Sequence, residues 1–189
     1  NPKQKNSIQN LMQRPVLDAS LVSPKGYFRI HYSTSGQNVP QYDINEFAFA
    51  ADSAYDFEVY QIGFPPPKDN GDGGDNLYDI YITDIGNVYG YTQPENEISN
   101  GSNKYFTYMV IHNSFNDFYT EGINAAKVTV AHELFHGIQL SNYIAKFNSN
   151  ELIDSYFYEL NSTAMEDFVF PYVNDYVGYI NGYFNNTSK

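Results

Sequence analysis

Hydrophobic residues recur along this chain with two different spacings, which predict where strands and helices form. In three stretches apolar or aromatic residues alternate with polar ones, or β-branched and aromatic residues dominate, as in strands. These predicted strands are residues 27–32, 77–83 and 105–112. In four other stretches the apolar residues follow the spacing of one helix face. These predicted helices are residues 43–60, about 123–144, about 152–168 and about 173–184.

The order of these elements predicts an α+β fold in which a small twisted sheet packs on the second helix, with further helices behind it. A length of 189 residues suits one domain. Residues 1–26 are polar and interrupted by prolines, which predicts an extended N-terminal arm. Residues 27–189 would form the domain, with the sheet and second helix in 27–144 and a helical subdomain in 145–189. The stretch 86–103 is predicted to be a loop.

The second predicted helix carries a pentapeptide, HExxH, with the spacing of a zinc site. His132 and His136 are four residues apart, so both imidazoles lie on one helix face and can bind one ion at about 2.0–2.1 Å. Glu133 is rotated by about 100° from His132 and can reach a metal-bound water without being a ligand. The alternative is that two surface histidines lie four apart by chance, although at this composition only about 0.004 such matches are expected.

A catalytic zinc ion usually has three protein ligands and one open position, so the site needs a third ligand. The chain contains no cysteine, which leaves His and carboxylate side chains. Gln139 and Asn142 stand where the HExxHxxGxxH pattern of metzincins requires Gly and His, which excludes that class. The next helix carries Glu159 and Glu166, seven residues apart and therefore on one face. Either could complete the site, or both could lie on a solvated acidic face.

With these residues in view, the chain resembles the gluzincins, the HExxH-plus-Glu zinc peptidases with a thermolysin-like zincin fold. More closely, it resembles bacterial secreted metalloproteases of the MXAN_6640 type over nearly its whole length. The stretches that carry this resemblance are residues 14–17, 26–32, 73–75, 78–81, 130–139, 165–167 and 174–176, together with Pro171. The resemblance implies a zincin-like catalytic domain over 27–189, with Glu159 as the third ligand and with Glu166 or Asp167 supporting a ligating histidine.

The resemblance also implies zinc-assisted hydrolysis of a peptide bond, in which Glu133 takes a proton from the zinc-bound water. Gluzincins commonly stabilise the oxyanion with a Tyr or His from the C-terminal half. The candidates here, each of which could instead be an aromatic core residue, are Tyr172, Tyr176 and Tyr179. The exopeptidase motif of aminopeptidases, of GxMEN type, is absent, which favours an endopeptidase. Strand 105–112 would form the sheet edge that binds substrate, with His112 lining the cleft or simply ending the strand.

A second candidate metal site is the loop over residues 69–76. Its carboxylates are closely spaced and its glycines allow sharp turns, as in loops that bind calcium. These carboxylates, with one from the following strand, are Asp69, Asp72, Asp75 and Asp79. The spacing is not that of an EF-hand, and the alternative is an ordinary Asp/Gly turn.

The charge and hydropathy of the chain limit the classes of partner that it could bind. A net charge of −12 argues against nucleic acids and anionic membranes, and no apolar run is long enough to span a bilayer. We therefore expect a monomeric, secreted bacterial zinc endopeptidase that acts on proteins or peptides, with Zn²⁺ and with Ca²⁺ as a candidate second ion. The alternative is a catalytically silent or latent gluzincin-like module that serves as a binding domain of a larger secreted protein. The intact Glu133 argues against a silent module.

Overall fold

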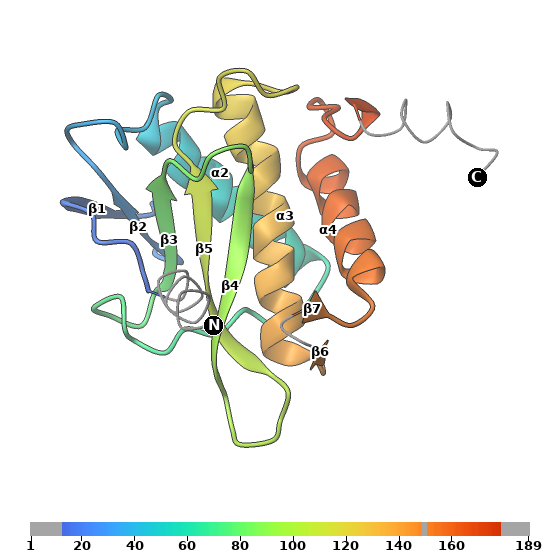
Figure 1. Cartoon of the computed structure of the whole chain (residues 1–189). Helices are drawn as coiled ribbons and strands as arrows, with labels where there is room; N and C mark the ends of the chain where they lie inside the picture. The colour runs from blue at the N-terminus through green and yellow to red at the C-terminus, as the bar shows by residue number, and fades with distance from the viewer. Residues whose placement is uncertain (1–12, 149–150, 179–189) are drawn as a thin grey trace, which may run out of the picture.

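The computed structural model describes residues 13–148 and 151–178, and its centre is a mixed sheet in the order β1-β2-β3-β5-β4. The strands are β1 (Ala19–Val22), β2 (Phe28–Tyr32), β3 (Tyr78–Thr83), β4 (Gly90–Glu97) and β5 (Tyr105–His112). The three inner strands β2, β3 and β5 are parallel, whereas β1 and β4 pair antiparallel with their neighbours and form the two edges (Figure 1).

The helices lie on one face of this sheet, and α3 is the central one. The helical segments are α2 (Ile44–Tyr55), the π-helical continuation η1 (Asp56–Gln61), α3 (Gly122–Asn142) and α4 (Ser155–Val169). α3 contacts β4, β5 and α2, and α4 packs against α3 (Figure 1). Because α3 lies between the sheet and α4, it is buried on most sides, as expected for a helix with apolar residues all around.

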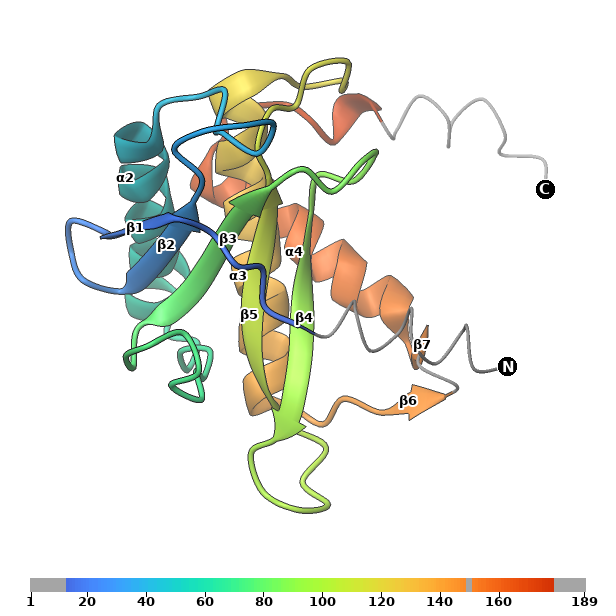
Figure 2. The same cartoon turned by 60° about the vertical axis from the view of Figure 1, so that its left-hand side comes forward.

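The core forms where the helix-facing side chains of the sheet meet α2 and α3. Its fully buried strand residues include Phe28, Ile30, Ile80, Ile82, Met109 and Ile111. The opposite face of the sheet carries a smaller cluster of Tyr81, Tyr108 and Val110, against which Leu17 packs. Figure 2 shows the chain before β1 running across this face, so the chain itself covers part of it.

The sequence correctly predicts the α+β class, all three of its proposed strands and three of its helices. Asp43 caps α2 by accepting hydrogen bonds from the backbone N–H groups of Asn45 and Glu46. In the fourth predicted helix, about 173–184, residues 173–176 are not helical, residues 177–178 are helical, and residues 179–184 lie outside the described part of the chain. Within the described part, no helix is both long and apolar enough to cross a membrane.

Two edge strands and a short hairpin lie where the sequence predicts none. β4 lies in the predicted loop 86–103. It is paired on one side only, and its Pro94 and polar residues do not give the sequence pattern of a strand. β1 lies within the predicted N-terminal arm, and β6 (Phe147–Asn148) pairs with β7 (Glu151–Leu152). As a result, the prediction that strand 105–112 is the sheet edge is wrong, because β4 lies outside it.

Candidate metal centre

Helices α3 and α4 bring together three side chains that could hold a metal ion. His132 Nε2 lies 3.0 Å from His136 Nε2, and Glu159 places its carboxylate oxygens 3.2 Å from the first and 3.4 Å from the second. Ligands at zinc–nitrogen distances around a tetrahedral ion are about 3.3 Å apart. Among the described residues, this is the one group of His, Asp and Glu side chains whose ligand atoms converge in this way. The donor set and its spacing fit a zinc ion.

The other nitrogen of each imidazole is already hydrogen-bonded. His132 Nδ1 lies 2.6 Å from Glu166 Oε1, and His136 Nδ1 lies 3.0 Å from Gln139 Oε1 and 3.1 Å from Ser162 Oγ. Such bonds to Nδ1 fix the ring orientation and leave Nε2 as the free ligand atom. Both rings therefore present the same nitrogen to the point where Glu159 meets them.

The carboxylates around His132 favour positive charge at this point. Burial lowers the pKa of His132, but hydrogen bonds with Glu159 and Glu166 outweigh it and raise that pKa to about 10. Hydrogen bonds with the two histidines hold the pKa of Glu159 well below its usual range. Burial raises the pKa of Glu166, and although His132 opposes this, the nearby charges of Asp175 and Glu133 add to it. The cluster is thus a partly buried acidic environment that a cation would stabilise.

Glu133, the predicted proton acceptor, lies beside this cluster and is held by the edge strand. The hydroxyl of Thr92, in β4, lies 2.8 Å from Glu133 Oε2 and 2.7 Å from its backbone oxygen. β4 approaches α3 closely at Gly90, where a Cβ atom would lie 2.7 Å from Thr129 Cγ2 and 3.1 Å from Glu133 Cγ. Only a glycine fits that contact without displacing the helix or the strand.

Two cavities adjoin the candidate metal centre: all three ligand residues line the first, and His132 and Glu159 line the second. The first, of about 530 Å³, lies between β4 and α3 and also reaches the β6–β7 hairpin and Asp175. The second, of about 710 Å³, lies on the α4 side, and its more apolar wall includes Leu160, Ala164 and Phe168. His132, Glu159 and Glu166 line both cavities, so the candidate metal centre is accessible from two sides.

The structure places the predicted accessory residues differently. Tyr176 lines the second cavity near His132, whereas Tyr172 is 62% exposed and its ring lies 5.9 Å from Lys127 Nζ. Tyr179 lies outside the described residues. Asp167 lines the second cavity, but Glu166 is the residue that contacts a histidine.

His112 lines a different cavity, which does not include the three ligand residues. Its Nε2 lies 3.6 Å from Asp84 Oδ1, and its Nδ1 accepts a hydrogen bond from the backbone N–H of Ser114 at 3.0 Å. It therefore does not line the cleft between β4 and α3.

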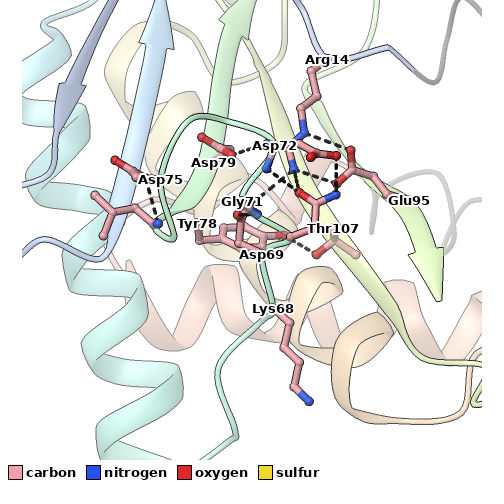
Figure 3. Close-up of polar contacts among 12 residues, drawn as sticks. Arg14, Lys68, Asp69, Gly71, Asp72, Asp75, Tyr78, Asp79, Glu95 and Thr107 are labelled. Atoms are coloured by element: carbon pink, nitrogen blue, oxygen red, sulfur yellow. Dashed lines mark hydrogen bonds and ion pairs between the residues drawn. The ribbon is translucent and has the colours of Figure 1, made fainter. Parts of the chain in front are cut away.

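The predicted calcium loop is organised around an arginine (Figure 3). The Arg14 guanidinium donates to Glu95 at 2.7 and 3.0 Å and to Asn70 at 2.9 Å, and it also contacts Asp69 and Asp79. It lies 5.0 Å from the ring centre of Tyr108 as well. A cation supplied by the chain itself thus lies among these carboxylates.

The remaining carboxylates of this loop point to other partners. Asp75 pairs with Arg29, and Asp72 accepts a hydrogen bond of 2.9 Å from Asn70. The second oxygen of Asp79 lies 2.7 Å from His31 Nε2. The four predicted ligands therefore do not all converge on one point among the described residues, and calcium binding here stays a prediction.

Several residues of the site are missing from the sequence interpretation. Gln139 and Ser162 hold His136, and each lies three residues beyond a proposed ligand, on the same helix face. That spacing could have identified both residues from the sequence. Thr92 gave no such signal, because it lies in a predicted loop, and Asp175 belongs to a stretch that carries the resemblance but was given no role in the site.

No protein-family model matches this chain, and comparisons with curated proteins and with solved structures give no match either. The gluzincin resemblance therefore remains a prediction that rests on the chain's own residues. These residues form a site with two imidazoles, one carboxylate and an adjacent Glu133, all of which a metal-dependent hydrolase would use.

Proposed function

We propose that this protein is a zinc-dependent peptidase of the gluzincin type, with zinc held by His132, His136 and Glu159. The observation that carries the proposal is the convergence of these ligand atoms at 3.0–3.4 Å beside the buried Glu133. Three protein ligands leave a fourth position for water or substrate, which is the arrangement of catalytic rather than structural zinc.

The roles of the side chains follow from their contacts. Bound zinc would lower the pKa of a water molecule and polarise the carbonyl group of the substrate. Glu133 would accept a proton from that water at its carboxylate and deliver it to the leaving amine. The Thr92 hydroxyl at 2.8 Å keeps the Glu133 carboxylate turned toward the cleft. Glu166 and Gln139 keep the two imidazoles in place during this transfer.

The open edge of β4 supports a peptide as the substrate. The backbone N–H of His112 donates to the carbonyl of Tyr89 at 2.9 Å, so these two residues form a hydrogen-bonded pair. Along β4 and β5, hydrogen-bonded pairs then alternate with pairs that are not hydrogen-bonded to each other. This alternation turns the backbone groups of Gly90 and Thr92 toward the open edge. An extended peptide could pair with them, whereas Pro94 has no N–H to offer. The paired stretch would lie directly in front of Glu133.

Metal analysis and a peptidase assay on two variants test this proposal. The wild type should retain about one zinc per chain, and Glu159→Gln should lose it because one of three ligands is gone. Glu133→Ala should retain zinc and lose cleavage of an unstructured protein substrate by about 10²–10⁴-fold. Elemental analysis measures the metal, and peptide release with and without a chelator measures the activity.

The matched control is Glu121→Gln, which removes an exposed glutamate that forms no capping bond at the start of the same helix. It should leave both metal content and cleavage unchanged. Zinc retained in full by Glu159→Gln would contradict the ligand assignment. A zinc-loaded wild type that cleaves nothing would instead indicate the silent binding module.

A further inference from the structure

The cleft of the candidate metal centre is strongly acidic. Among the described residues, no Lys or Arg lines either of the two cavities at the site. The carboxylates that line them are Glu133, Glu159, Glu166, Asp167 and Asp175. A divalent ion would leave this set negative overall, and clefts with low-dielectric walls strengthen such a field. The cleft should therefore favour positively charged groups of a ligand.

Two of these carboxylates are buried at one end of the first cavity. Asp175 is 3% exposed and accepts a hydrogen bond of 3.3 Å from the hydroxyl of Tyr89, the residue that precedes β4. Glu166 is 7% exposed, and its Oε2 atom has no hydrogen-bond partner. A buried carboxylate oxygen without a partner is costly, so a cation nearby would be stabilising.

The opposite end of the same cavity is apolar. Leu140, Phe147 and Leu152 line it. The Phe147 ring lies 5.4 Å from that of Tyr105, which pairs with Glu97 at the far end of β4. The cavity thus runs along β4, from an acidic end near Gly90 to an apolar end near Glu97, with the metal ligands between.

The direction of β4 sets the direction of a bound peptide. Antiparallel pairing is the more stable arrangement for an added strand. A peptide antiparallel to β4 would place residues on the N-terminal side of the cleaved bond at the apolar end. Residues on the C-terminal side would lie at the acidic end, beside Asp175 and Glu166.

We infer that the site prefers peptides with an apolar residue before the cleaved bond and a Lys or Arg after it, with Asp175 as the specificity-determining residue. This inference rests on the proposed peptidase function. It deepens that function by naming the chemistry of the substrate on each side of the cleaved bond.

A set of three short peptides, differing only around the central bond, tests the inference. Their central pairs are Leu-Lys, Leu-Glu and Lys-Leu. Wild-type protein loaded with zinc should cleave the Leu-Lys peptide with the highest kcat/KM, by about 10-fold over Leu-Glu. Added salt should narrow this difference, because part of it is electrostatic.

Asp175→Asn should reduce the Leu-Lys preference several-fold and leave zinc content unchanged. Asn keeps an acceptor oxygen for the Tyr89 hydroxyl, so the turn should hold its shape. The control is Asp72→Asn, which removes the same charge from an exposed loop outside both cavities. Equal kcat/KM for Leu-Lys and Leu-Glu, or a preference unaffected by Asp175→Asn, would overturn the inference. Preference for Lys-Leu would overturn the peptide direction.

Binding of the same peptides to Glu133→Ala, measured by fluorescence anisotropy, separates this inference from the proposed hydrolysis. Selective binding of the Leu-Lys peptide without any cleavage by the wild type would reject the peptidase function, but it would support the preference for a cationic residue at the acidic end of the cavity. Cleavage of all three peptides without selectivity would support the peptidase function and reject the inferred substrate preference. Absence of both binding and cleavage would reject both.

Discussion

At the scale of single residues, the site depends on which nitrogen of each imidazole is free. The HExxH spacing predicts that two imidazoles share a helix face, but it does not say how each ring is turned. The structure supplies that information through Glu166 on His132 and through Gln139 and Ser162 on His136. Glu166 and Ser162 come from another helix and Gln139 from the next turn of the same one, so the pentapeptide itself contains none of them.

The contact between Glu166 and His132 can be tested against its immediate neighbour. Glu166→Gln should weaken zinc affinity by about 10–100-fold, because an amide is a poorer partner for the Nδ1–H group than a carboxylate. Asp167→Asn is the matched control and should leave the affinity unchanged. Competition with a chromogenic chelator measures both. Equal losses in the two variants would mean that net charge, rather than this hydrogen bond, sets the affinity.

Glu58 in η1 is a second residue whose role can be tested. It is fully buried, neither carboxylate oxygen has a hydrogen-bond partner, and burial raises its pKa well above the ordinary range. The folded state therefore keeps a proton that the unfolded chain releases above about pH 4.5. Stability contributed by this proton is present at low pH and is lost as the pH rises toward the raised pKa.

Glu58→Met should consequently raise the free energy of unfolding at pH 7, by about 1–3 kcal/mol. The gain should shrink at pH 4. Urea unfolding at several pH values measures this, and Glu58→Gln is the control that removes the charge but keeps polar atoms. A gain that is the same at pH 4 and pH 7 would contradict the assignment of a protonated, buried Glu58.

At the scale of elements, prediction succeeds for strands and helices with a buried face and fails at the sheet edges. The inner strands β2, β3 and β5 carry buried side chains that impose a readable pattern. β4 is paired on one side, contains Pro94 and has no fully buried residue, so its sequence reads as a loop. The edge strand at which we propose that substrate binds is thus the element that the sequence predicts least well.

The loop before β3 shows the same limit, because its partner comes from far along the chain. Arg14 is 55 residues or more away from the carboxylates that it contacts. The wild-type protein should therefore have the same midpoint of thermal unfolding in calcium as in EGTA, since Arg14 already supplies positive charge in this loop. Arg14→Met should lower the free energy of unfolding by about 3 kcal/mol, because it leaves buried carboxylates unpaired.

The control for this variant is Lys25→Met, which breaks an exposed ion pair with Asp56 and should have a much smaller effect. Thermal melts and urea unfolding measure both variants. A calcium-dependent midpoint in the wild type would show that the loop binds the ion despite Arg14.

At the scale of the whole molecule, both walls of the cleft belong to one continuous stretch of chain. β4, β5 and α3 follow one another between Gly90 and Asn142. Glu159 alone among the proposed ligands arrives from outside that stretch, on α4. The sequence could predict this division of ligands between two helices, because each lies in a segment with a helical pattern. It could not predict how firmly α4 is held.

The attachment of α4 affects how the protein is held together. The buried residues of α4 are Ser162, Met165 and Glu166, and two of these three contact the histidines of α3. α4 therefore buries little hydrophobic surface, and an ion bound by residues of both α3 and α4 would hold the two helices together. Removing zinc should speed amide hydrogen exchange in α4 far more than in α3 or β5. By mass action, the ion would then regulate local unfolding, so metal supply would also set the protein's resistance to proteolysis at α4.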